Sequence, residues 1–165
     1  MKETKTVFRL FFVWSFEKEE AWLNTMAEQG WALDGVGFGY YHFTRCEPGE
    51  YTVRSETRNV SSDYVSFLEE TGAEYIGHVF QWAYFRKKTE LGQFDLYSDL
   101  DSRIAHLKRI NGVLYAAAFV NLFLGIVNRK GLGWINLLCF AMLTYAIGRI
   151  HGKEETLEKD RQLRE

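Results

Sequence analysis

The sequence predicts an α+β domain built from two strand-helix-strand-strand repeats, followed by a two-helix transmembrane hairpin. Two observations predict this fold class. Residues 6–88 contain an internal repeat with a period of forty-two residues, and the window 111–148 is almost free of charge in a chain that is 25% charged. A length of 165 residues suits one ordinary domain with an attached segment.

The repeat appears when the sequence is aligned with itself at an offset of forty-two, without a gap. Five of the eighteen aligned positions between residues 28 and 45 are identical, and six more positions between residues 22 and 45 hold similar residues. A period of this kind sets the architecture, because each copy forms the same supersecondary unit. The identical pairs are Glu28 with Glu70, Gly30 with Gly72, Gly35 with Gly77, Phe38 with Phe80, and Phe43 with Phe85.

Each copy begins with an apolar strand, continues with an amphipathic helix and ends with an aromatic hairpin. Ser15, and Ser61 or Ser62, precede the helices as N-caps, and Gly30 and Gly72 end them. We expect the two sheets to pair and both helices to cover one face. The predicted inner faces are Trp22, Leu23, Met26 and Ala27 in the first helix, and Tyr64, Phe67 and Leu68 in the second. The predicted strands are 6–14, 31–38, 40–45, 50–56, 74–79 and 81–88.

This topology, over residues 6–88, resembles that of the GyrI-like ligand-binding domains. These domains duplicate the same module, and the resemblance implies that lipophilic compounds bind in a cleft between the halves. No shared motif supports the resemblance, and a fold alone does not establish a function.

The uncharged window predicts two membrane spans, 111–128 and 131–148. Arg129 and Lys130 are the only charged residues between them and mark the turn. Eighteen helical residues cover about 27 Å, close to the thickness of a bilayer's hydrocarbon core. A buried helical hairpin of a soluble protein is the alternative, and the rest of the chain is small for wrapping two wholly apolar helices.

The cations flanking the spans predict the orientation. Eight lie before the first span or after the second, against two in the turn. The positive-inside rule then places the N-terminal domain and the charged tail, 149–165, on the cytoplasmic side of the membrane. The segment 91–110 is expected to be a juxtamembrane helix. The N-terminus has no pattern typical of a signal peptide, so Cys46 is expected to remain a free thiol.

Small and polar residues predict how the two spans pack. Asn121 and Asn136 lie at similar depth, and an interhelical hydrogen bond would satisfy both amides. An ion or substrate pathway is the alternative, but neither span contains a charged residue. The predicted packing seam comprises Ala118, Asn121, Gly125, Gly133 and Asn136.

The sequence offers little for catalysis. The stretch GVGFGYY fits a hairpin better than a dinucleotide loop, because no helix follows it. His42, His78, His106 and His151 are scattered, and the acidic run EKEE at 17–20 is interpreted as a solvated helix start. We therefore expect no enzyme activity, no cofactor and no metal. A net charge of −2 with a pI near 6.1 also speaks against direct nucleic-acid binding.

The abundance of aromatic residues in the first ninety positions is the remaining signal. Core packing explains most of them, and a pocket between the repeats is the alternative. In such a pocket, Glu56 would attract a lipophilic cation and the rings would surround it. The predicted ligand-binding residues are Trp14, Tyr40, His42, Tyr51, Arg54, Glu56, Trp82 and Tyr84.

Several stretches resemble a bacterial membrane-associated family, domain of unknown function 2812. They are FEKEEAWLNTMAEQGW, EPGEY, FLEETGAEYIG, WAYFRKK and SDLDSRIAHLKRI. The resemblance implies a cytoplasmic domain followed by transmembrane helices, often accompanied by a PadR-type transcriptional regulator. It implies no catalytic residues.

These observations favour a membrane-anchored cytoplasmic sensory or regulatory protein that binds a small lipophilic ligand between the repeats. The alternative is a non-enzymatic accessory subunit that docks on a regulator or membrane protein without a ligand. A transporter subunit is disfavoured, although a homo-oligomer is compatible with the sequence. The expected partners are the lipid bilayer, a PadR-type regulator or other protein, and the ligand. An open aromatic cleft would favour the sensor, and a filled junction with an exposed apolar patch the accessory subunit.

Overall fold

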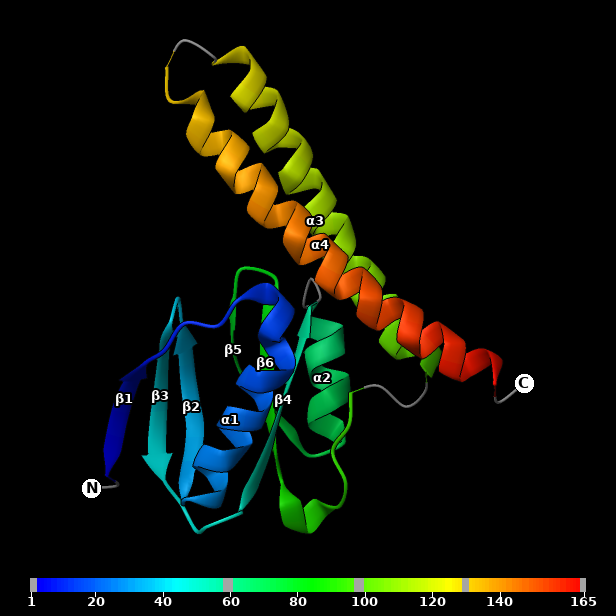
Figure 1. Cartoon of the computed structure of the whole chain (residues 1–165). Helices are drawn as coiled ribbons and strands as arrows, with labels where there is room; N and C mark the ends of the chain where they lie inside the picture. The colour runs from blue at the N-terminus through cyan, green and yellow to red at the C-terminus, as the bar shows by residue number, and fades with distance from the viewer. Residues whose placement is uncertain (1–2, 58–60, 97–99, 129–130, 164–165) are drawn as a thin grey trace. The chain divides into compact units, whose positions relative to one another are not determined.

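The structure is a computed structural model that describes residues 3–57, 61–96, 100–128 and 131–163. The chain divides into two compact units, Met1–Leu96 and Tyr97–Glu165, called unit 1 and unit 2 below. Unit 1 is an α+β domain and unit 2 is a pair of long helices (Figure 1). The predicted fold class is confirmed.

Unit 1 contains the same order of elements twice. The first half has β1 (Thr4–Phe8), the short 3-10 helix η1 (Val13–Ser15), α1 (Phe16–Glu28), β2 (Trp31–Gly37) and β3 (Tyr40–Arg45). The second half has β4 (Tyr51–Thr57), α2 (Ser62–Glu70), β5 (Ala73–Val79) and β6 (Trp82–Lys88), and the 3-10 helix η2 (Thr89–Leu91) follows it. The first strand is shorter than predicted, because it ends at Phe8.

Each half forms its own three-stranded antiparallel sheet. The strand orders are β1-β3-β2 and β4-β6-β5, which are equivalent orders. Each sheet has a register shift at the same place, between Leu33 and Gly35 in β2 and between Tyr75 and Gly77 in β5. These positions are forty-two residues apart, so the two halves share topology and register irregularity.

The prediction that the sheets would pair is wrong, because no backbone ladder joins them within the described residues. Strands β2 and β5 are neighbours, but a side chain connects the sheets there. Arg86 on β6 donates from Nη1 to the carbonyl oxygen of Leu33, at 2.6 Å, and lies 3.5 Å from the Asp34 carboxylate. The guanidinium thus satisfies a carbonyl group that a ladder would otherwise use.

The helix ends follow the sequence signals in part. Ser61 accepts a hydrogen bond from the backbone N–H of Tyr64 and so caps α2, whereas Ser15 makes no side-chain cap bond at α1. Gly30 and Gly72 adopt φ values of 81° and 84° just after the two helices. Phe67 was predicted on the inner face of α2, and this prediction is wrong. Its side chain is 60% exposed, and the buried residue of α2 is Leu68.

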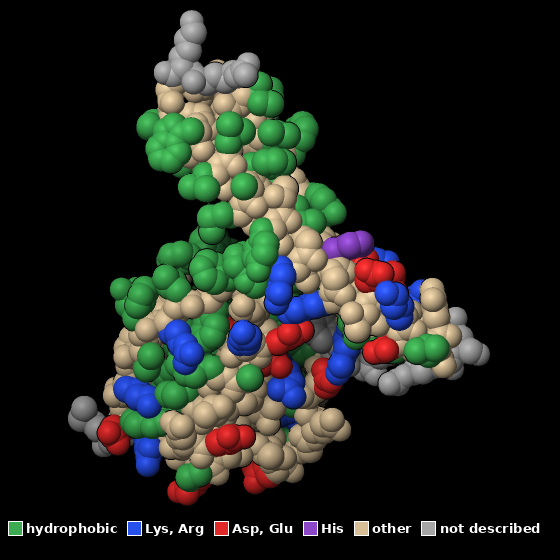
Figure 2. Space-filling view, in the orientation of Figure 1, with side chains coloured by type: hydrophobic (Ala, Val, Ile, Leu, Met, Phe, Trp, Pro, Cys, Tyr) green, Lys and Arg blue, Asp and Glu red, His purple; other side chains and the backbone are tan. Residues whose placement is uncertain are grey.

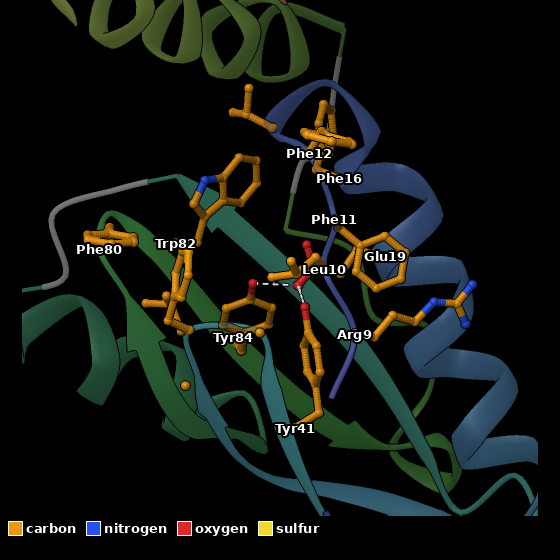
Figure 3. A pocket seen from close by; sticks show the side chains of 15 residues that line it. Arg9, Leu10, Phe11, Phe12, Phe16, Glu19, Tyr41, Phe80, Trp82 and Tyr84 are labelled. Atoms are coloured by element: carbon orange, nitrogen blue, oxygen red, sulfur yellow. Dashed lines mark hydrogen bonds between the residues drawn. The ribbon is translucent and has the colours of Figure 1, made fainter. Parts of the chain in front are cut away.

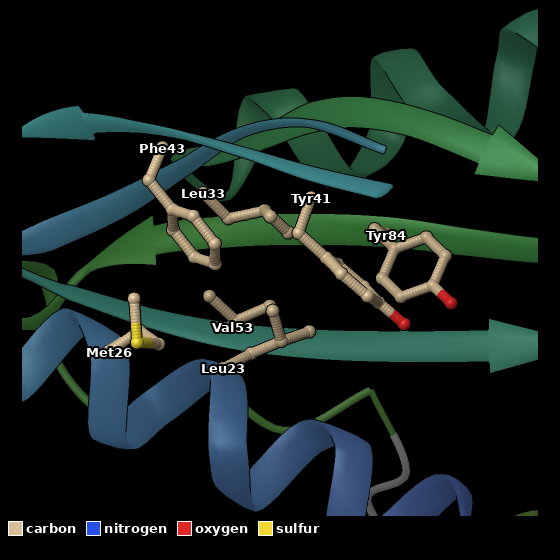
Figure 4. Close-up of a cluster of buried hydrophobic side chains, with 7 residues drawn as sticks. All are labelled: Leu23, Met26, Leu33, Tyr41, Phe43, Val53 and Tyr84. Carbon is tan, nitrogen blue, oxygen red and sulfur yellow. The ribbon is translucent and has the colours of Figure 1, made fainter. Parts of the chain in front are cut away.

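The main core lies between α1 and the inner faces of both sheets (Figure 4). Leu23 and Met26 project from α1, Leu33 comes from β2, Tyr41 and Phe43 from β3, Val53 from β4 and Tyr84 from β6. A second cluster lies on the other face of the second sheet, where Phe85, Ala83 and Ala73 pack with Leu68 of α2 and with Phe94. Alternate residues of β6 therefore enter different cores.

Helix α1 covers the free edge of β4. The Asn24 side chain accepts a hydrogen bond from the backbone N–H of Val53 at 2.8 Å and donates to its carbonyl oxygen at 3.1 Å. One turn earlier, Glu20 accepts from the N–H of Ser55 at 3.1 Å. The two side chains replace the neighbouring strand that an edge lacks, and an exposed edge is a template for aggregation.

Unit 2 consists of α3 (Leu100–Val127) and α4 (Gly133–Gln162), which pack against each other. Both helices are long and apolar enough to cross a membrane. Their apolar side chains are largely exposed, and Figure 2 shows hydrophobic groups over their surface. Each is one continuous helix, so the predicted spans extend into the neighbouring polar segments. Arg129 and Lys130, the predicted turn, lie outside the described residues.

Small residues bring the two helices together near the turn. A Cβ atom on Gly133 would lie 2.7 Å from the carbonyl oxygen of Gly125, and one on Gly125 would lie 2.7 Å from Leu137. Ala118 is also buried, and Asn136 is half-buried. The Asn121 amide donates to the carbonyl oxygen of Ala117 in its own helix, at 2.9 Å, so the expected bond to Asn136 is absent from the contacts of the described residues.

The polar ends of α3 and α4 are joined by charged pairs. Lys108 lies 3.0 Å from Glu158 and 3.7 Å from Glu154, and Arg161 lies 2.9 Å from Asp101. The predicted charged tail, 149–165, continues α4 as far as Gln162. The helix expected at 91–110 starts at Leu100 instead, because Phe94 packs into the second core of unit 1.

Candidate functional site

A pocket lies at the end of unit 1 where the two hairpin turns meet the segment that precedes α1. Its volume is about 170 Å³. Residues 37–39 and 79–82 supply the turns, and residues 9–13 with Phe16 and Glu19 supply the opposite wall. Tyr41 and Tyr84 come from the central strands β3 and β6, so both halves contribute (Figure 3).

A buried carboxylate lies at the base of this pocket. Glu19 Oε1 accepts hydrogen bonds from the hydroxyl groups of Tyr41 and Tyr84, each at 2.6 Å. Burial, together with the charge of Glu19, raises the pKa of both tyrosines well above its usual range. The second oxygen of Glu19 has no hydrogen-bond partner among the described residues. One oxygen is thus held in place, and the other is available to a ligand.

Aromatic rings surround the carboxylate. Phe16 and Trp82 lie 5.5 Å apart between ring centroids, and Phe11 contacts Tyr41 at 6.4 Å. Arg9 also lines the pocket, but its guanidinium stacks on Phe11 at 5.0 Å and points away from Glu19 (Figure 3). The pocket therefore presents negative charge at its base and ring faces along its walls, a combination that suits organic cations.

The mouth of the pocket is an exposed apolar patch formed by Leu10, Phe12, Phe38 and Phe80, called the apolar rim below. Phe38 is 68% exposed and Phe80 is 79% exposed, and their rings meet edge to face at 5.8 Å. They are repeat-equivalent residues in the two hairpin turns. Phe80 has a φ of 53°, which is unfavourable for a residue other than glycine.

Three of the residues predicted to bind a ligand lie at or beside this pocket. Trp82 and Tyr84 line it, and Trp14 stacks on Phe12 of the rim with ring centroids 4.7 Å apart. Tyr40 and His42 lie on the outer face of the first sheet, where Tyr40 contacts Phe8 and His42 bonds to Thr6. The alternation of β3 directs them away from Tyr41 and the pocket.

The other three predicted residues come from β4 and do not line the pocket. Glu56 is buried on the α2 side of the second sheet, where it accepts a hydrogen bond from Tyr64 Oη. Arg54 lies 3.4 Å from Glu20, and Tyr51 stacks under the guanidinium of Arg86 at 4.7 Å. Glu56 is therefore not placed to act as the polar anchor expected of it, and the carboxylate that lines this pocket is that of Glu19.

Glu19 was missed because acidic residues in a first helical turn are usually solvated. The spacing carried a contrary signal. Glu19 precedes Trp22, Leu23 and Met26 by three, four and seven residues, so it belongs to the apolar face of the helix. A carboxylate on that stripe must either be buried or break the stripe.

Groups able to hold a metal are absent from the described residues, in which no three His, Cys, Asp or Glu side chains cluster. Cys46 and Cys139 are both unpaired thiols in the structure. Burial raises the pKa of the Cys46 thiol, with a smaller contribution from Glu50, so the thiolate is disfavoured there.

The fold and the pocket define a class of protein: an α+β domain with a small aromatic cavity, joined to two helices that can cross a membrane. Within that class, the chain belongs to the family described as protein of unknown function (DUF2812), whose model matches residues 15–119. The match includes most of unit 1 and the larger part of α3. Comparison with curated proteins and with solved structures gave no match.

Proposed function

We propose that this protein is a membrane-anchored sensor or regulatory protein whose unit 1 binds a small lipophilic cation in the pocket at Glu19. The observation that carries the proposal is the buried carboxylate with one oxygen fixed by Tyr41 and Tyr84 and the other without a hydrogen-bond partner among the described residues. A buried charge is costly unless it is paired, and a bound cation would complete the pairing.

The dimensions of the pocket restrict the ligand. A cavity of about 170 Å³ is smaller than the roughly 300 Å³ at which drug-sized sites begin. It is close to the roughly 150 Å³ cavity that holds one benzene molecule. The expected ligand is therefore a single ring with a cationic head, or the cationic head of a longer amphiphile whose tail leaves through the apolar rim.

Binding is favoured over catalysis by the state of the two tyrosines. Burial and the Glu19 charge raise the pKa of Tyr41 and Tyr84, so neither hydroxyl is prepared to act as a base or nucleophile. Their hydrogen bonds to Glu19 orient the carboxylate instead. We therefore propose a non-enzymatic role without a cofactor.

The two apolar helices support the remainder of the proposal. Helices of this length and composition would anchor unit 1 at the bilayer, where lipophilic cations accumulate. We place unit 1 and the end of α4 on the cytoplasmic side, following the excess of cations at that end of the hairpin. A regulator of the PadR type is the expected receiver of the signal.

Ligand binding is tested with the full chain in a mild detergent. Benzyltrimethylammonium and its uncharged carbon analogue of the same shape are titrated while thermal unfolding is followed. A ligand that binds only the folded state adds about 2.7 kcal/mol of stability at a hundredfold excess over Kd. We expect the cation to raise the unfolding midpoint more than its neutral analogue.

Two matched variants locate the ligand. Glu19→Gln removes the charge at the base of the pocket, and Glu56→Gln removes the other buried carboxylate that holds a tyrosine hydroxyl, on the opposite face of the sheet. The preference for the cation should disappear in the first variant and persist in the second. Equal loss in both variants, or no preference in the unaltered chain, would refute the site.

The accessory subunit without a ligand is the second candidate, and the filled interior favours it. The junction between the halves is occupied by Leu23, Tyr41 and Tyr84, and the pocket lies beyond them at the end of the domain. An absence of any thermal shift across single-ring cations and neutral compounds would leave this candidate in place of the sensor.

A further inference from the structure

We propose that the apolar rim of unit 1 inserts into the surface of the lipid bilayer. The rim combines Leu10 and Phe12 from the segment before α1 with Phe38 and Phe80 from the two hairpin turns. This inference concerns the outer surface of the domain and goes beyond the binding of a ligand in the pocket. It holds whether or not a cation occupies the site at Glu19.

The rim is a single patch made from three separate parts of the chain. Phe38 contacts Phe80, and all four residues border the same pocket. Each of the four side chains is more than half exposed. Figure 2 shows hydrophobic side chains gathered at one end of the domain. Contiguous exposed aromatic groups on turn tips are unfavourable in water and mark an interaction surface.

The charges around the rim fit a lipid surface. The three segments that carry the rim residues, 7–16, 35–43 and 75–85, contain no acidic residue, and Arg9 is their only Lys or Arg. The opposite end of the domain is different, because the loop from β3 to β4 contains Glu47 and Glu50. The rim itself therefore adds no carboxylate that anionic headgroups would repel, and phenylalanine and leucine side chains can bury at the boundary between headgroups and acyl chains.

The connection to unit 2 supplies the proximity that weak insertion needs. Unit 1 ends at Leu96 and α3 begins at Leu100, a separation of four residues that spans at most about 14 Å. The polar part of α3, residues 100–110, adds roughly 16 Å before the apolar segment. If α3 crosses the membrane, Leu96 stays within about 30 Å of the lipid, so the domain attached to it experiences a high effective concentration of lipid.

The test uses the full chain, one copy per nanodisc, with equal parts of phosphatidylcholine and phosphatidylglycerol. In a background with Cys46→Ser and Cys139→Ser, a polarity-sensitive fluorophore is attached through Gln81→Cys, beside Phe80. A second sample carries the fluorophore through Glu47→Cys, at the opposite end of unit 1. Both positions are exposed. Nanodiscs with brominated acyl chains quench fluorophores that lie in the lipid.

We expect blue-shifted emission at position 81 that brominated lipid quenches and aqueous iodide does not, with the opposite result at position 47. Adding Phe38→Ser and Phe80→Ser should reduce the quenching at position 81 to the level at position 47. Equal quenching by iodide at both positions would overturn the proposal. So would shielding from iodide without quenching by brominated lipid, since a protein surface or a second copy would then cover the rim.

Discussion

The two halves of unit 1 share element order, strand order and the position of a register shift, yet they bury different surfaces. In the first half, α1 packs on one face of the sheet, and the other face, with Tyr40 and His42, remains outside. In the second half, both faces are covered, because Phe85 packs toward α2 and Tyr84 packs toward α1.

The difference arises from α1. This helix is thirteen residues long, against nine in α2, and it reaches beyond its own sheet to the edge of β4. Asn24 and Glu20 make that contact, and Glu19 bonds to tyrosines from both sheets. The residues of α2 at the equivalent positions are Ser66, Ser62 and Ser61. The two halves have similar architecture, but the pocket at Glu19 is asymmetric because, of the two helices, only α1 carries side chains that contact both halves.

The largest expected losses of stability come from removing a core phenylalanine, and they should be equal in the two halves. Phe43 and Phe85 are repeat-equivalent and fully buried, in different clusters. Phe43→Ala and Phe85→Ala should each lower the free energy of unfolding by about 3–5 kcal/mol. Urea unfolding of the full chain in detergent, followed by tryptophan emission with Trp134→Phe so that all tryptophans lie in unit 1, measures both. A loss below about 1 kcal/mol in either variant would show that its half does not share the cooperative core.

The next two substitutions, at the equivalent residues Asn24 and Ser66, should have unequal effects on the free energy of unfolding. They test whether α1 alone contacts the other half. Asn24→Ala leaves the backbone N–H of Val53 without its acceptor at 2.8 Å, which should cost about 1–3 kcal/mol. Ser66 is the equivalent residue of α2 and is exposed, so Ser66→Ala should change the free energy of unfolding by less than about 0.5 kcal/mol. The same urea titration decides the matter, and equal effects would contradict the role assigned to Asn24.

The sequence predicted what depends on local pattern. The order of elements, the hairpins and the ends of both helices at Gly30 and Gly72 followed from periodicity and turn residues. It did not predict which face of each strand would be buried by the other half, so Tyr40 was grouped with Trp82. Which face of a strand is buried depends on how α1 packs across the two sheets. A repeat alignment treats the two halves as equivalent, so it cannot predict a contact that only one helix makes.

Alanine substitutions at Gly30 and Gly72, which follow the two helices, should lower the free energy of unfolding by amounts that differ less than those of the previous pair. Both have φ near +80°, where alanine is strained by about 1–2 kcal/mol. A Cβ at Gly30 would also lie 2.9 Å from the backbone oxygen of Cys46, whereas one at Gly72 would meet the flexible end of Leu91. Gly30→Ala should therefore lower the free energy of unfolding more than Gly72→Ala. The reverse order would mean that the Cys46 backbone moves more easily than the Leu91 side chain.

The smallest expected effect is the pH dependence that Tyr84 confers on the second half. Burial, with the charge and hydrogen bond of Glu19, raises the pKa of Tyr84 in the folded state. Above about pH 10 the unfolded chain loses the tyrosine proton while the folded chain keeps it, so the free energy of unfolding falls as pH rises. Tyr84→Phe removes this contribution and lacks one hydrogen bond, so it should be less stable at pH 8 and lose stability less steeply between pH 9 and 11. Urea midpoints across that range give both slopes. Parallel slopes would mean that Tyr84 ionises as readily in the folded chain as in the unfolded one, and that the hydroxyl is not enclosed with Glu19 as the structure places it.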